Sequence, residues 1–105
     1  MSKGVVRIGT MTAQDGRGQE LLDFAKRVVM PILRGSDGFL GGELLHNQDE
    51  PNSILIIERW ENAEAHMASA KNIPPEAIQE VMGMLGGPPA GAYYSSIQHV
   101  EISNV

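Results

Sequence analysis

The sequence predicts an α+β domain in which helices cover one face of an antiparallel four-stranded sheet. Segments rich in β-branched residues alternate with segments whose apolar residues recur every three to four positions. They follow one another in the order strand, helix, strand, strand, helix, strand, which is typical of a ferredoxin-like βαββαβ fold. The chain has 105 residues, so we expect one domain over residues 1–105.

The first part of the chain is expected to form a strand and a long helix. Residues 5–11 are β-rich, and Asp15 in the loop that follows is a suitable N-cap. An apolar stripe of helical period then runs through residues 19–33. Pro31 should kink this helix or end it at Met30, because proline lacks the backbone donor and clashes with the preceding turn.

The second part is expected to supply three strands and a helical region in two pieces. Residues 39–47 and 53–60 flank a short polar turn, which predicts an antiparallel hairpin. A short helix over 63–70 and a second helix opened by Pro74-Pro75 follow. Residues 93–102 are predicted to be the last strand.

The third strand carries apolar residues on both of its faces. Leu55 and Ile57 alternate with Ile54, Ile56 and Trp60. Helices in such a fold hide only one face of the sheet, so the other face needs a different cover. We therefore expect a homodimer in which two sheets stack.

Composition excludes several classes of function. The net charge of −5 gives no basic surface for nucleic acid or for an anionic membrane. The absence of cysteine excludes disulfides, thiolate metal sites and a cysteine nucleophile. No apolar run approaches the ~20 residues that span a bilayer, and no secretory signal is visible. We expect a cytoplasmic protein.

The chain resembles the antibiotic biosynthesis monooxygenase family of dimeric α/β-barrel proteins, from Val5 to about Ile102. The resemblance is strongest in the segments GFLGGEL (38–44), DEPN (49–52), LIIERW (55–60) and NAEAH (62–66). It implies a small homodimer with one pocket in each subunit. Some members oxidise phenolic or polycyclic substrates with O2 and use neither flavin nor metal.

The resemblance implies a cofactor-independent monooxygenase that acts on a small phenolic, quinol or polycyclic aromatic substrate, with molecular oxygen as co-substrate. The branch that acts on polycyclic phenols has an asparagine where this chain has Ile56, and a family arginine is replaced near Glu80. These differences favour an alternative, a non-catalytic dimeric module that holds a small aromatic or apolar metabolite. A haem-binding or haem-degrading protein is less expected, because the first strand lacks that branch's asparagine.

Trp60 and His66 are the predicted catalytic pair, because they share one strand-to-helix corner. Trp60 resembles the family's pocket tryptophan and could stack on a flat substrate, although a lone tryptophan is as often simply core. His66 has the pKa range of a general base or of a donor to an oxygen anion.

Three further residues are candidates for substrate binding, namely Asn62, Arg7 and Tyr94. Asn62 is also fully explained as a helix N-cap, and Arg7 could pair with Glu43. Either Tyr93 or Tyr94 is expected over the pocket or the dimer seam. No metal site is predicted, because the three histidines are scattered and lack ligand spacing.

Overall fold

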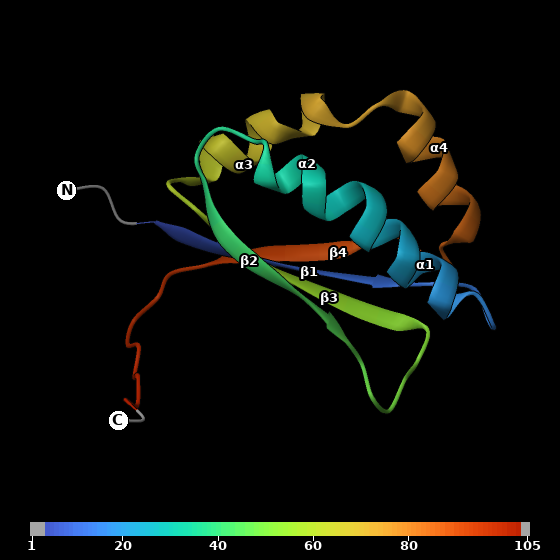
Figure 1. Cartoon of the computed structure of the whole chain (residues 1–105), viewed down its shortest axis with the longest axis horizontal. Coiled ribbons are helices and arrows are strands. Elements are labelled where there is room, and N and C mark those ends of the chain that lie inside the picture. The colour runs from blue at the N-terminus through green and yellow to red at the C-terminus, as the bar shows by residue number, and fades with distance from the viewer. Residues whose placement is uncertain (1–3, 104–105) are drawn as a thin grey trace.

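The computed structural model describes residues 4–103 and contains one antiparallel sheet with helices on one of its faces (Figure 1). The strand order across the sheet is β2-β3-β1-β4. The strands are β1 (Val5–Thr12), β2 (Phe39–His46), β3 (Ser53–Trp60) and β4 (Ala90–Tyr94). The predicted α+β ferredoxin-like order and the predicted hairpin of β2 with β3 are confirmed.

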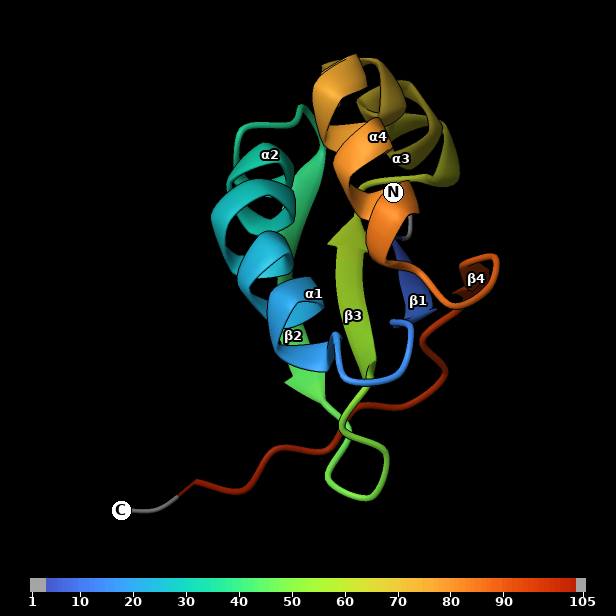
Figure 2. The same cartoon turned by 90° about the vertical axis from the view of Figure 1, so that its right-hand side faces the viewer.

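The helices form two separate rods, which Figure 2 shows beside one another. The first rod consists of α1 (Gly18–Phe24), a π-helical turn η1 (Ala25–Val29) and α2 (Met30–Arg34). The second consists of α3 (Ala63–Ser69), a 3-10 turn η2 (Ala70–Asn72) and α4 (Pro75–Met84). No helix of the described chain is long and apolar enough to cross a membrane.

The first rod passes through Pro31 without a break, so the prediction that it could end at Met30 is wrong. The Met30 N–H donates to the carbonyl of Ala25, five residues back, instead of four. A proline ring clashes with the carbonyl four residues before it in an α-helix. The wider π turn just before Pro31 relieves this conflict and lets the helix continue to Arg34.

The start of the first rod also differs from the expectation. Asp15 is not the N-cap; Arg17 occupies that position, and its side chain makes no capping bond. The N–H of Gly18 is instead bound by the Oδ1 atom of Asn52 at 3.2 Å, from the distant β2–β3 turn. A tertiary contact therefore satisfies a backbone donor at the start of this helix in place of a local cap.

The last strand lies earlier than the predicted residues 93–102. It begins at Ala90 and pairs with β1 from Thr10↔Ala90 to Val6↔Tyr94. Beyond Tyr94 the described part of β1 offers almost no further backbone to pair with, so the ladder ends there. Residues 95–103 continue as an extended tail away from the sheet (Figure 1). Its apolar side chains are exposed, with Ile97 at 91%.

The core lies between the helices and the facing side of β3. Ile54, Ile56 and Trp60 are buried there and pack with helical residues such as Leu21 and Leu33. The opposite side of the sheet carries no helix (Figure 1). Its strands place Val6, Ile8, Leu45, Leu55 and Ile57 on that side, where all of them keep part of their surface exposed.

Candidate functional site

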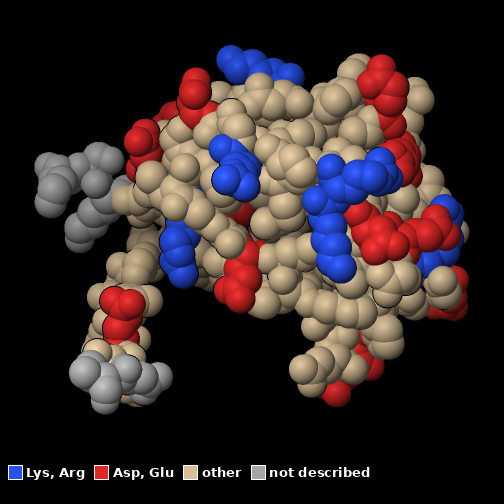
Figure 3. Space-filling view, in the orientation of Figure 1, with Lys and Arg blue, Asp and Glu red and all other residues tan. Residues whose placement is uncertain are grey.

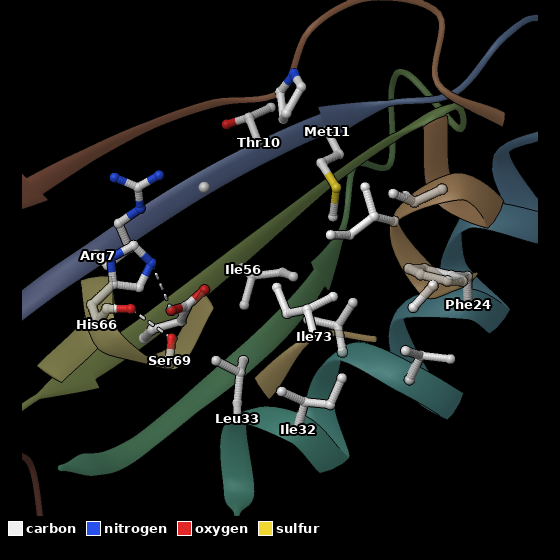
Figure 4. A pocket seen from close by; sticks show the side chains of 18 of the residues that line it. Arg7, Thr10, Met11, Phe24, Ile32, Leu33, Ile56, His66, Ser69 and Ile73 are labelled. Atoms are coloured by element: carbon white, nitrogen blue, oxygen red, sulfur yellow. Dashed lines mark hydrogen bonds and ion pairs between the residues drawn. The ribbon is translucent and has the colours of Figure 1, made fainter. Parts of the chain in front are cut away.

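A cavity of about 260 Å³ lies between the sheet and the two helical rods. Most of its wall is apolar and comes from the helices and from β1 and β3. The charged and titratable groups gather at one end. Figure 4 shows Arg7, His66 and Ser69 together at that end, with Phe24 and Ile32 far from them. The cavity therefore suits a molecule with an apolar body and one polar end.

Three neighbouring strands build the polar end. Arg7 on β1 lies opposite Glu58 on β3 and opposite Tyr93 on β4, so the three residues form one row across the sheet. His66 reaches over this row from α3. The start of α3 is fixed by Asn62, whose Oδ1 atom accepts a hydrogen bond of 2.8 Å from the Ala65 N–H.

Two side-chain hydrogen bonds and one close approach connect these residues. The His66 Nδ1 atom lies 2.5 Å from the hydroxyl of Tyr93. Its Nε2 atom lies 3.9 Å from Oε1 of Glu58. That carboxylate oxygen accepts a hydrogen bond of 2.9 Å from the indole N–H of Trp60. Ser69 donates to the His66 backbone carbonyl at 2.6 Å. The imidazole is thus held by the hydroxyl of Tyr93 at one nitrogen, and the carboxylate of Glu58 lies near the other.

Burial shifts the ionisation of both titratable groups at this end. Loss of solvent lowers the pKa of His66, and the nearby positive charge of Arg7 lowers it further. Loss of solvent raises the pKa of Glu58, while the Trp60 hydrogen bond and Arg7 act in the opposite direction. His66 is therefore neutral at pH 7 and is able to accept a proton.

Arg7 supplies a positive charge at the same end. Its guanidinium lies over the ring of Tyr93, with Cζ 5.1 Å from the ring centroid. It occupies the space beside Gly91, where a Cβ atom would lie 2.9 Å from the Arg7 Nε atom. No carboxylate of residues 4–103 lies within ion-pair distance of it. The charge is therefore available to an anion in the cavity.

Of the five predicted site residues, two line the cavity and three do not. His66 and Arg7 line the cavity. Trp60 is fully buried behind its wall, with its ring centroid 5.2 Å from Phe39 and 5.5 Å from His66. Asn62 is exposed and caps α3. Tyr94 lies on the other face of the sheet and is 52% exposed. Trp60, Asn62 and Tyr94 do not line the cavity, so their contact with a substrate stays a prediction.

Two polar residues of the site, Glu58 and Ser69, are absent from the prediction, and Tyr93 entered it only as the alternative to Tyr94. Glu58 stands two positions before Trp60, and this spacing places both side chains on one face of a strand. Ser69 follows His66 by three positions, and residues at this spacing share one face of a helix. Tyr93 differs from Tyr94 only in strand parity, which depends on pairing with β1. The first two had a local signal, and the third did not.

The remaining charged groups form no second site in the described chain. No group of three or more histidine, aspartate or glutamate side chains in residues 4–103 could hold a metal ion. His46 binds the carbonyl of Pro51 at 2.8 Å, and His99 lies in the tail. On the face shown in Figure 3, lysine and arginine are scattered among acidic residues and form no continuous basic surface.

Comparisons with known proteins agree with this architecture. A family model described as antibiotic biosynthesis monooxygenase matches residues 4–81. The cofactor-independent oxygenase SnoaB from Streptomyces nogalater is 17% identical, with a TM-score of 0.77 over 93% of this chain and 97% of its own. A protein from Pseudomonas aeruginosa is 20% identical, with a TM-score of 0.76 and coverages of 93% and 98%. The search of curated proteins finds no match.

Proposed function

The chain belongs to the antibiotic biosynthesis monooxygenase family, and from this premise we propose that it is a cofactor-independent monooxygenase. Its substrate would be a small phenolic, quinol or polycyclic aromatic compound, and its co-substrate would be O2. The observation that carries the proposal is the apolar cavity whose single polar end holds a base, His66, and a cation, Arg7. The likeness in fold to a cofactor-independent oxygenase supports it.

The reaction begins with loss of a proton from the substrate. The ring lies in the apolar part of the cavity and its hydroxyl meets His66. When Nδ1–H donates to the hydroxyl of Tyr93, Nε2 of His66 carries a free lone pair and takes the hydroxyl proton. Arg7 stabilises the anion that remains. The apolar walls keep water away from the reactive anion.

The anion then reduces O2 without a cofactor. Its electron pair forms a bond between a ring carbon and oxygen, and the peroxide gains a proton. Loss of the C–H proton and cleavage of the O–O bond leave a carbonyl on the ring and release water. One oxygen atom enters the product and the other becomes water, so the substrate supplies all four electrons.

Oxygen uptake tests the proposal. The purified protein is mixed with a panel of quinols and anthrones, and O2 is followed with an electrode. We expect uptake above the uncatalysed rate and a loss of about 100-fold or more in His66→Gln, because a positioned base contributes that much. His46→Gln is the matched control, since His46 lies outside the cavity. No uptake with any member of the panel, or full activity in His66→Gln, would contradict the proposal.

A non-catalytic module for a small aromatic or apolar metabolite is the second candidate. Ile56 favours it, because this apolar side chain lines the cavity wall where a catalytic branch would have a polar one. Organic extraction and mass spectrometry of the purified protein would show a retained metabolite. A retained metabolite with no O2 uptake supports this candidate. A titration with haem, followed by Soret absorbance, tests the haem alternative in the same way.

We also propose that the protein is a homodimer that buries the helix-free face of the sheet. The half-exposed apolar side chains on that face, with Ile8 and Ile57 paired at its centre, support this arrangement. Light scattering after size exclusion should give twice the monomer mass. Ile57→Lys should give monomer, and Met82→Lys, at a position 63% exposed on α4, should not. A monomer in the unmodified protein at all concentrations would contradict the dimer.

A further inference from the structure

The carboxylate of Glu58 lines the cavity but has no part in the reaction described so far. Glu58 is only 8% exposed, and its Oε1 atom is held by the Trp60 N–H at 2.9 Å. Its Oε2 atom accepts no hydrogen bond from the described side chains, yet no buried polar side-chain atom there is left without a partner. Oε2 therefore has open space beside it, which the cavity provides.

The proposed reaction contains a second proton abstraction, which a second base beside His66 would serve. His66 takes the hydroxyl proton and can return that proton to the peroxide anion. The C–H proton of the peroxide-bearing carbon must then leave while the O–O bond breaks, and the departing hydroxide must gain a proton. Among the described residues that line the cavity, Glu58 is the only carboxylate. Its Oε1 atom lies 3.9 Å from Nε2 of His66, so both groups reach the same end of the substrate.

We propose that Glu58 is a second catalytic acid–base group of this site, which removes the C–H proton and transfers it to the departing hydroxide. This inference rests on the proposed function. The electron pair of the C–H bond becomes the second bond of the new carbonyl, the O–O bond breaks, and hydroxide takes the proton from Glu58 to form water. Glu58 ends as the carboxylate with which it began, so the cycle needs no other reactant.

The surroundings of Glu58 suit this role. The titratable and charged groups that face it are Arg7 from β1 and His66 from α3, while both helical rods contribute apolar side chains to the cavity. Burial raises the pKa of Glu58, which makes the carboxylate a stronger base than an exposed one. The Trp60 N–H fixes the orientation of the carboxylate, so Trp60 acts as a positioning residue.

The first experiment examines Glu58 without any reaction. Trp60 is the only tryptophan of the chain, and its N–H touches Glu58, so its fluorescence should follow the ionisation of that carboxyl. We expect a transition centred above pH 4.5 in the unmodified protein, its absence in Glu58→Gln, and a displaced midpoint in His66→Gln. Identical titrations of the unmodified protein and Glu58→Gln, or an unmoved midpoint in His66→Gln, would overturn the inference.

The second experiment separates the two proton transfers in a single turnover. Glu58→Gln keeps an oxygen for the Trp60 N–H but cannot accept a proton. We expect the coloured substrate anion to form within twofold of the normal rate, while product formation falls by about 10²–10⁴-fold. Glu61→Gln, at an exposed position outside the cavity, is the matched control.

The outcomes are distinguishable. Normal product formation in Glu58→Gln overturns the inference, and so does loss of anion formation, because Glu58 would then only position His66. Failure of the unmodified protein to consume O2 refutes the proposed function. In that case Glu58 has no reaction to serve and the catalytic inference falls with it, whereas the fluorescence titration still decides whether Glu58 and His66 are coupled.

Discussion

A single methyl group at Gly91 should disable the anion site of the cavity. A Cβ atom built on Gly91 overlaps the Arg7 guanidinium and meets Arg7 Nε at 2.9 Å, and its three nearest atoms all belong to Arg7. The guanidinium is the far end of a flexible side chain, so in Gly91→Ala it moves and β4 stays. Gly91 is not among the described glycines with a positive φ, so alanine fits its backbone.

The energy of a charged hydrogen bond sets the size of the effect. A hydrogen bond from a charged donor contributes about 1.5–3 kcal/mol. Loss of that contact should weaken binding of a phenolate by about 10- to 150-fold. The free energy of unfolding should stay unchanged or rise by about 0.4–1 kcal/mol, because alanine restricts the unfolded chain. Binding and stability therefore change in different ways.

The assay is an absorbance titration with 4-nitrophenol, whose anion has its own colour, alongside urea unfolding. Gly83→Ala is the control, because no atom lies within 4 Å of its added Cβ. Toluene serves as a neutral ligand that needs no cation. Unchanged phenolate affinity in a folded Gly91→Ala variant would refute the reasoning, and so would an equal loss of toluene binding.

Three other changes test the contacts around the site. Trp60→Phe should lower the free energy of unfolding by about 1–3 kcal/mol, because it leaves Oε1 of buried Glu58 without its donor. A double-mutant cycle with Glu58→Gln, followed by urea unfolding, measures the coupling energy between the two side chains. Asn62→Ala should lower the free energy of unfolding by about 1 kcal/mol in thermal unfolding through loss of the α3 cap, with Gln98→Ala, at an exposed position in the tail, as the comparison. The pKa of His66 is lowered in the fold from 6.5, so the unfolded chain binds more protons than the folded one just below pH 6.5. The free energy of unfolding should therefore fall there as the pH drops. His66→Gln should flatten this slope in urea unfolding at a series of pH values, and an unchanged slope would contradict the shift.

Local patterns predict most of the fold correctly. The alternation in β1, β2 and β3, the Asn62 cap and the start of α4 at Pro75 are all readable from neighbouring residues. The last strand is not, because Ala90–Tyr94 is poor in β-branched residues and its position is imposed by pairing with β1. The cap of α1 is not readable either, because Asn52 provides it from a distant turn.

The candidate site is predictable in part for the same reason. Arg7 and His66 line the cavity because strand parity and helix position direct them there. Trp60 lies at the expected corner, but its depth depends on how Phe39 and the helices pack around it. The choice of Tyr93 over Tyr94 follows from the β1–β4 register, which no local pattern contains. Packing and register therefore decide what the sequence leaves open.

The π turn from Ala25 to Val29 makes the width of the cavity adjustable by changes in chain length. The turn holds one residue more than an α-helical turn, and Val28 and Val29 within it both line the cavity. Deletion of one residue there would restore an α-helical turn and rotate the preceding part of the rod by about 100° relative to α2. Relatives that gain or lose this residue would accept ligands of different breadth on an unchanged sheet.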